Sequence, residues 1–313
     1  MTTKRAIVFP GQGSQSVGML ADLYQQFDVV KDTFTEASNA LGYDLWALVA
    51  NGPEADLNET HRTQPALLTA SVAVWRLWQQ QGGAQPAYFA GHSLGEYSAL
   101  VCAGVLSLAD AVKLVEKRGN YMQLAVPAGV GAMSAIIGLD DAAIAVACEQ
   151  AAQGEVVSPV NYNSPGQVVI AGHKAAVERA GELCKAYGAK RALPLPVSVP
   201  SHCALMKPAA DKLAVDLAGL NFHPTVIPVL NNVDVAIAVA QNDIKDALVR
   251  QLFSPVRWTE SIEWLATQGV TEVVEIGAGK VLAGLIKRID KNLQTTSVND
   301  VATLQAALNP AAE

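Results

Sequence analysis

Cysteine is scarce in this chain of 313 residues, which has four cysteines far apart in the sequence, at positions 102, 148, 184 and 203. No pair of them has the C-x-x-C spacing that is typical of a zinc or redox site. Isolated cysteines in apolar or mixed segments indicate free thiols in a reducing compartment. We therefore expect no metal site and a cytoplasmic protein.

Long apolar runs and basic runs are also missing. The apolar run at residues 6–9 ends at Pro10, too short for a signal peptide, and no other run has the length of a membrane span. The formal net charge is -7, and no basic cluster is interleaved with aromatic residues, so nucleic-acid binding is not expected. Half of the residues are apolar and 16% are charged, which favours a folded protein with a large core.

Two glycine-rich segments lack the last residues of known nucleotide-binding motifs. Gly11-Gln12-Gly13-Ser14-Gln15 follows a predicted strand, but Ser16 stands where a dinucleotide fingerprint needs its third glycine. Gly277-Ala278-Gly279-Lys280 is followed by Val281, so the Ser or Thr of a P-loop is absent. We interpret residues 11–15 as a loop that donates a backbone N–H to an oxyanion; the alternative is a plain glycine turn.

Strand and helix patterns alternate along most of the chain, which predicts an α/β fold with a mostly parallel sheet. The expected strands there are 5–9, 88–90 and 271–276, and the expected helices are 29–40, 64–81, 95–104, 108–124, 208–219, 243–253, 259–268 and one from 281. The middle has the order β-α-β-β-α-β, which is typical of a ferredoxin-like unit. Its strands are expected at 131–138, 156–161, 167–171 and 190–197, its helices at 141–152 and 174–187, and a turn at 163–166. We therefore expect a small domain over 130–197, inserted into a discontinuous large domain of residues 1–129 and 198–313.

The segment with the clearest chemistry is Gly91-His92-Ser93-Leu94-Gly95, between a short apolar strand and a helical segment. Strand, sharp turn and helix around Gly-x-Ser-x-Gly are typical of a nucleophile elbow. The glycines allow a strained turn and close packing, and the helix N-terminus directs free N–H groups to the serine. The motif predicts acyl transfer through an ester on Ser93, with Leu94 giving one oxyanion-hole amide. The alternative is a serine in an ordinary strand-to-helix turn.

A serine nucleophile needs a base, and the chain has five histidines. His92 adjoins Ser93, where neighbouring side chains diverge, and His61 lies in a predicted polar loop. His202 ends Val199-Pro200-Ser201-His202, a rigid loop before the helix opened by Pro208, and it is our candidate base; the alternative is a structural histidine. No aspartate stands out as a third triad member, so a backbone carbonyl or an amide side chain is expected to orient the base.

Arg118 lies on the apolar stripe of the predicted helix 108–124, between Val115 and Met122. An arginine on an apolar face needs a partner. We interpret it as a bidentate clamp for a substrate carboxylate, and the alternative is a structural ion pair or a snorkelling side chain.

Taken together, these segments resemble the malonyl-CoA:acyl-carrier-protein transacylases of fatty-acid synthesis over essentially the whole chain. The resemblance rests on Phe9-Pro10-Gly11-Gln12-Gly13-Ser14-Gln15, Thr63-Gln64-Pro65-Ala66, Gly91-His92-Ser93-Leu94-Gly95-Glu96, Arg118, Val199-Pro200-Ser201-His202 and Glu275-Ile276-Gly277. It implies an α/β-hydrolase-like large domain with an inserted ferredoxin-like domain. It also implies Ser93 as nucleophile, His202 as base, Arg118 on the malonyl carboxylate, and the amides of Gln12 and Leu94 as the oxyanion hole. The carbonyl near Gln251 would orient His202, and Gln64 and Gln251 would lie near the substrate.

The implied reaction moves malonyl from malonyl-CoA to the phosphopantetheine thiol of an acyl carrier protein, with ping-pong kinetics. CoA is then part of a substrate, and we expect no cofactor and a monomer. Since the carrier and CoA are acidic, a local basic patch is expected, with Lys185, Lys190, Arg191, Lys287 and Arg288 as candidates. Two alternatives stay open: a serine esterase or thioesterase, and a non-catalytic module that docks carrier proteins.

Overall fold

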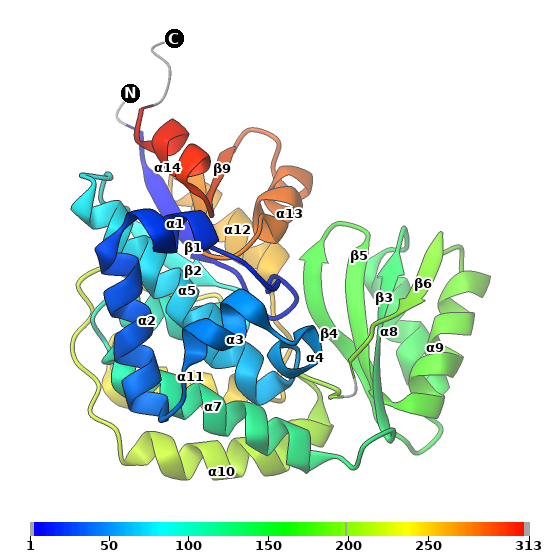
Figure 1. Ribbon diagram of the computed structural model, residues 1–313. Helices are drawn as coiled ribbons and strands as arrows, with labels where there is room; N and C mark the ends of the chain where they lie inside the picture. Colours follow the sequence, from blue (N-terminus) through cyan, green and yellow to red (C-terminus); the bar gives the residue numbers. More distant parts are fainter. Residues whose placement is uncertain (1–2, 198, 310–313) are drawn as a thin grey trace.

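A computed structural model describes residues 3–197 and 199–309 of the chain (Figure 1). Residues 1, 2, 198 and 310–313 lie outside the described residues, so both outer ends of the predicted large domain and its internal boundary at 198 are not covered. None of the helices in the described ranges is long and apolar enough to cross a membrane.

The protein has an α/β fold built on a parallel sheet. Five strands, in the order β7-β2-β1-β8-β9, form this sheet, and every neighbouring pair is parallel. They are β1 (Arg5–Phe9), β2 (Tyr88–Gly91), β7 (Val229–Leu230), β8 (Glu272–Ile276) and β9 (Gln294–Val298). Phe9 is the register partner of Gly91, so the loops that follow β1 and β2 leave the sheet side by side.

Helices surround this sheet (Figure 1). They are α1 (Ala21–Gln26), α2 (Asp28–Leu41), α3 (Leu45–Asn51), α4 (Glu54–Leu57), α5 (Thr60–Gln80), α6 (Leu94–Cys102), α7 (Leu108–Ala125), α10 (Lys207–Ala218), α11 (Gln241–Gln251), α12 (Trp258–Thr267), α13 (Val281–Ile289) and α14 (Val301–Leu308), with a 3-10 turn at Ala204–Met206. Because both faces are covered, β1 is apolar at every position after Arg5. Ile7 and Phe9 belong to one core cluster, and Ala6 and Val8 to a second cluster on the opposite face.

A second sheet has four strands in the order β4-β5-β3-β6, and every neighbouring pair is antiparallel. Its elements are β3 (Gly131–Ile137), α8 (Asp141–Ala152), β4 (Val157–Ser164), β5 (Gln167–His173), α9 (Lys174–Ala186) and β6 (Arg191–Pro194). This part, green in Figure 1, lies to one side of the parallel sheet. The predicted β-α-β-β-α-β element order is therefore present in the structure.

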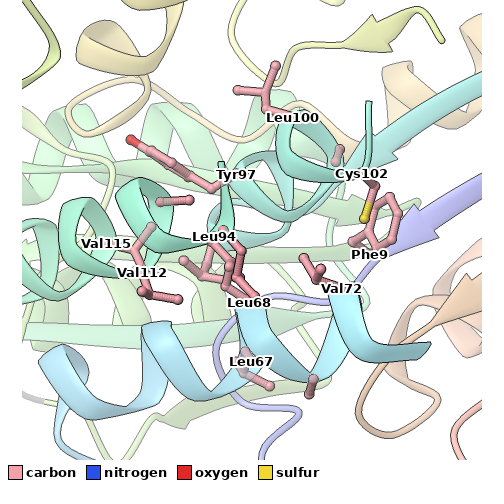
Figure 2. Close-up of a cluster of buried hydrophobic side chains, with 14 of the residues drawn as sticks. Phe9, Leu67, Leu68, Val72, Leu94, Tyr97, Leu100, Cys102, Val112 and Val115 are labelled. Carbon is pink, nitrogen blue, oxygen red and sulfur yellow. The ribbon is translucent and has the colours of Figure 1, made fainter. Parts of the chain in front are cut away.

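The packing of α5, α6 and α7 places the chemistry. Figure 2 shows side chains from these helices in one cluster, including Leu68 of α5, Leu94 of α6 and Val115 of α7. Leu94 is 1% exposed, so the first turn of α6 is held in the core directly after Ser93. The contacts of α7 with α5 likewise fix the helix that carries Arg118.

Three local predictions are wrong. The strand expected at 190–197 spans Arg191–Pro194, because the prolines at 194 and 196 have no N–H to donate to a ladder. The helix expected to begin at 64 begins at Thr60, so His61 lies in α5 and not in a polar loop. Proline is disfavoured inside a helix but tolerated in its first turn, so Pro65 is typical of a helix that begins near residue 64. In the structure Pro65 lies inside α5. The turn expected at 163–166 is shorter, because Asn163 and Ser164 belong to β4. Asn163 falls at a register shift between Tyr162 and Ser164, and such a bulge explains a turn-like residue inside a strand.

Candidate active site

Ser93 lies between the last residue of β2 and the first residue of α6, in a strained backbone conformation. Its φ of 50° and ψ of -108° are rare for a residue with a side chain. Such backbone strain costs on the order of 1–3 kcal/mol and persists only where the surroundings enforce it. The turn thus presents the Ser93 hydroxyl at the carboxyl edge of the parallel sheet, where sites of α/β proteins gather.

The two glycines of the pentapeptide permit this turn by their lack of a side chain. A Cβ on Gly91 would overlap the backbone carbonyl of Gly95, and a Cβ on Gly95 would overlap the carbonyl of Phe9. Helix α6 therefore approaches β1 and β2 more closely than any larger residue would allow.

Asn232 fastens the turn from a third segment, just after β7. Its Oδ1 accepts a hydrogen bond from the Ser93 backbone N–H at 2.8 Å, and its Nδ2 donates to the Gly91 carbonyl at 2.7 Å. Sequence reasoning did not single out Asn232. The available indication was its place after Leu230, at the carboxyl end of a strand that has only two residues.

His202 lies within hydrogen-bond distance of the Ser93 hydroxyl, with 2.8 Å between Nε2 and Oγ. Its Nδ1 lies 2.7 Å from the backbone carbonyl oxygen of Gln251, which can only accept. Nδ1 therefore carries the proton, and Nε2 is free to accept the proton of Ser93. Burial and the nearby charge of Arg118 lower the pKa of His202 from 6.5 to about 3, so the imidazole is neutral at pH 7.

Arg118 of α7 is a buried cation whose hydrogen-bond partners among the described residues are all neutral. It is 1% exposed; Nη1 donates to Gln64 Oε1 at 2.8 Å and Nη2 to Gln251 Oε1 at 3.0 Å. Nη2 also lies 3.4 Å from Ser93 Oγ, and Nε has no partner among the described residues. Burial lowers the pKa of Arg118, yet a guanidinium stays charged in proteins. A carboxylate brought to Ser93 would meet an unneutralised bidentate donor.

The backbone amides of Leu94 and Gln12 have no acceptor among the hydrogen bonds of the described residues. The other amides of the elbow are occupied, since Ser93 N–H donates to Asn232 and Gly95 N–H donates to the His92 carbonyl at 2.9 Å. Leu94 and Gln12 both line the cavity that contains Ser93 and His202. This arrangement leaves two donors for an oxyanion at the cavity wall.

The cavity at Ser93 has a volume of about 130 Å³ and is bounded by both sheets. The second sheet and the segment after it contribute Met133, Asn161, Leu195 and Val197. His92 joins the Ser93 turn to the second sheet, because its Nε2 lies 2.8 Å from Asn163 Oδ1. A larger cavity of about 1280 Å³ lies along α9 and β6; it shares Met133, Leu195 and Val197 with the first but is not lined by Ser93, His202 or Arg118.

The structure brings Ser93, His202, Arg118, Gln64 and Gln251 into direct contact and places Gln12 and Leu94 on the same cavity. It adds contacts from residues to which the sequence had assigned no role, namely Asn232, Asn161, Asn163 and Glu96. Within residues 3–197 and 199–309, no group of three or more His, Cys, Asp or Glu side chains is placed to bind a metal ion.

Comparison with known proteins gives consistent matches along the chain. The model of the family described as "Acyl transferase domain" matches residues 6–307. The malonyl CoA-acyl carrier protein transacylase of Escherichia coli strain K12 is 67% identical over 306 residues, which are 98% of this chain and 99% of that protein. The protein of the same name from Bacillus subtilis is 47% identical over 307 residues, 98% of this chain and 96% of that protein.

Two solved structures are similar over nearly their whole length. An acyl carrier protein S-malonyltransferase from Vibrio cholerae has a TM-score of 0.96 and 70% identity, covering 97% of this chain and 99% of that one. A malonyl-transacylase solved in complex with a type II PKS acyl-carrier protein has a TM-score of 0.97 and 64% identity, covering 98% of this chain and 99% of that one.

Proposed function

The chain belongs to the acyl transferase domain family, and we propose that it transfers the malonyl group of malonyl-CoA to the phosphopantetheine thiol of an acyl carrier protein, supplying fatty-acid synthesis. The observation that carries this proposal is the buried guanidinium of Arg118, which lies 3.4 Å from the Ser93 hydroxyl and whose acceptors within the described part of the chain are all neutral. A charged acyl group such as malonyl supplies the missing anion, whereas acetyl would leave the cation unpaired.

In the first half-reaction, Ser93 Oγ attacks the thioester carbonyl while its proton moves to His202 Nε2. The N–H groups of Leu94 and Gln12 stabilise the oxyanion, and one such donor is worth roughly 3 kcal/mol. The carbon–sulfur bond then breaks, His202 returns the proton to the CoA thiolate, and malonyl-Ser93 remains. Arg118 holds the malonyl carboxylate throughout, with Gln64 and Gln251 keeping its guanidinium in place.

The second half-reaction reverses these steps with the carrier's thiol as the nucleophile. His202 takes the thiol proton, the thiolate attacks the malonyl ester, and Ser93 regains its proton as the new thioester is released. Every proton passes through His202, so the route requires no cofactor, and CoA enters only as a substrate.

We also propose that the two sheets form two domains: a hydrolase-like domain of residues 1–129 and 198–313, and a ferredoxin-like domain of residues 130–197. The antiparallel order β4-β5-β3-β6 and a separate apolar cluster that includes Ile136, Ile144 and Val177 support the small domain. The expected monomer, the cytoplasmic location and the basic docking patch stay predictions.

The test is an intact-mass measurement after the protein is mixed with malonyl-CoA in the absence of carrier protein. We expect a stable malonyl adduct that disappears in Ser93→Ala. The matched control is Ser98→Ala, a buried serine of α6, the helix that follows Ser93, which does not line the cavity. Rapid release of free malonate would indicate a thioesterase or esterase, and neither adduct nor turnover would indicate a non-catalytic docking module.

A further inference from the structure

We infer that Glu96 is a positioning residue, which fixes the side-chain amide of Gln251 and thereby the guanidinium of Arg118. The inference rests on the proposed function, because it concerns how the site selects a charged acyl group. Glu96 lies on α6, three residues after Ser93, and is 2% exposed. A buried carboxyl needs partners, and those of Glu96 lead directly to the active site.

One oxygen of Glu96 holds two separate segments of the chain. Oε2 accepts a hydrogen bond from Gln251 Nε2 at 2.9 Å and another from the backbone N–H of Asn232 at 3.0 Å. Asn232 in turn holds the backbone of the Ser93 turn through its side-chain amide. Glu96 therefore supports the nucleophile's turn on one side and Gln251 on the other.

Gln251 is the point where the catalytic groups meet. Its side-chain oxygen accepts from Arg118 Nη2 at 3.0 Å, its Nε2 donates to the Ser93 carbonyl at 3.1 Å, and its own backbone carbonyl accepts from His202 Nδ1 at 2.7 Å. A change in the orientation of the Gln251 side chain would therefore break its hydrogen bond to Arg118. The hydrogen bond to His202 would stay, because it is made by the Gln251 backbone carbonyl.

The amide of Gln251 has two orientations, and Glu96 permits one of them. Arg118 only donates hydrogen bonds, so it needs the amide oxygen, whereas an ionised Glu96 only accepts, so it needs the amide nitrogen. With the amide rotated by half a turn, its NH₂ group would face the guanidinium and its oxygen would face the carboxylate. Glu96, together with the Ser93 carbonyl that accepts from the same Nε2, thus selects the orientation in which Arg118 has an acceptor.

This role depends on an acceptor atom at one place more than on a full negative charge. Burial raises the pKa of Glu96 from 4.5 to about 7, so a fraction of the side chain is protonated at neutral pH. A protonated carboxyl, like a glutamine amide, still offers one oxygen that accepts. The charge of Glu96 also stays one amide away from Arg118, which leaves the guanidinium open to a substrate carboxylate.

Two conservative variants separate position from charge. Glu96→Gln keeps an accepting oxygen and loses the charge, whereas Glu96→Asp keeps the charge and withdraws the oxygen by one methylene. We measure kcat and KM for malonyl-CoA and acetyl-CoA in each, normalised to the fraction of protein whose Ser93 can be acylated. Glu149→Asp, at an exposed position of α8, is the matched control.

We expect Glu96→Asp to lower kcat/KM for malonyl-CoA on the order of 10–100-fold, the loss that a misplacement of about one ångström causes. The malonyl-to-acetyl ratio should fall with it, because acetyl does not use Arg118. Glu96→Gln and Glu149→Asp should keep the wild-type ratio.

An unchanged ratio in Glu96→Asp, even with a lower melting temperature, would overturn the inference, since Glu96 would then only stabilise the fold. Equal loss of the ratio in Glu96→Gln would also overturn it, because charge and not position would matter. Failure of the proposed function is distinguishable: the wild-type protein itself would then form no malonyl adduct on Ser93.

Discussion

The parallel and antiparallel sheets contribute to one cavity in different ways. Among residues 3–197 and 199–309, the side chains that contact the Ser93 hydroxyl or the Arg118 guanidinium by a hydrogen bond come from segments around the parallel sheet: His202, Gln64 and Gln251. The antiparallel part contributes the wall residues Met133 and Asn161, and Leu195 and Val197 follow its last strand. In the proposed reaction, reactivity and acyl-group choice therefore depend on the part built around the parallel sheet, while the antiparallel part shapes the cavity.

The reason for this division is geometric. Parallel strands end at the same edge, so the segments after β1, β2 and β7 bring Gln12, Ser93 and Asn232 together there. An antiparallel sheet sends alternate strand ends in opposite directions, and here it presents a face to the cavity instead. Three predictions test this division, in order of decreasing effect.

Removing the cation of the parallel part should have the largest effect. We expect Arg118→Ala to lower kcat/KM for malonyl-CoA by about 10³-fold or more, because a site built for a polar group depends on that contact. Acetyl transfer should change far less. Arg118→Lys is the matched variant: it keeps the charge but loses the bidentate fork, so intermediate selectivity is expected. An unaltered malonyl-to-acetyl ratio in Arg118→Ala would contradict the assignment of acyl choice to this part.

The residues involved also show what the sequence could predict. The Ser93 turn was predictable because its glycines, strand and helix are neighbours in the chain, and Arg118 because one helix places it on an apolar stripe. Asn232 was not predictable, since β7 has two residues and the contact is made by a side chain 139 positions away from Ser93. The position of Asn163 depends on a bulge, which residue patterns did not distinguish from a turn.

The fold was predictable to the same extent and for similar reasons. The element order of the antiparallel sheet and the strands β1, β2 and β8 of the parallel sheet follow from local periodicity. The short helices α1, α3, α4 and α14 and the two edge strands β7 and β9 have little periodicity of their own and were missed. The carbonyl of Gln251 as the partner of His202 came only from the family resemblance, because a backbone acceptor has no residue type that marks it.

A smaller effect is expected in the pH dependence, where the Arg118 charge acts on His202. Burial and, to a smaller extent, the charge of Arg118 lower the pKa of His202 to about 3. Acylation needs the neutral imidazole, because it must accept the Ser93 proton. Wild-type acylation should therefore show no loss from His202 protonation between pH 8 and pH 5. In Arg118→Ala one of the causes that lower this pKa is gone, so the pKa rises toward 6.5 and the acid limb of acetyl transfer moves up by about one pH unit.

The stability of the protein should follow the same group with a defined sign. The unfolded chain binds a proton at His202 near pH 6.5 and the folded chain does not, so the contribution to stability decreases as the pH falls from 6.5 toward 3. The acid limb of acylation is measured as the pH profile of CoA release in the wild type, Arg118→Ala and Arg118→Lys. An acid limb at the same pH in all three would show that the Arg118 charge does not act on His202.

The smallest effect should come from cutting the contact between the two parts. Asn163→Ala removes the acceptor of His92 Nε2, a hydrogen bond of 2.8 Å that joins β4 to the Ser93 turn. One lost hydrogen bond is worth about 1 kcal/mol, so we expect a loss of kcat/KM of about 5-fold for malonyl-CoA and acetyl-CoA alike. The ratio between the two substrates should hold, because Arg118 and its partners Gln64 and Gln251 lie outside the antiparallel part.

Asn39→Ala, at an exposed position of α2, is the control for a simple loss of an amide. If Asn163→Ala changed the malonyl-to-acetyl ratio as strongly as Arg118→Ala does, the antiparallel part would help to select the acyl group, and its description as a wall would be wrong.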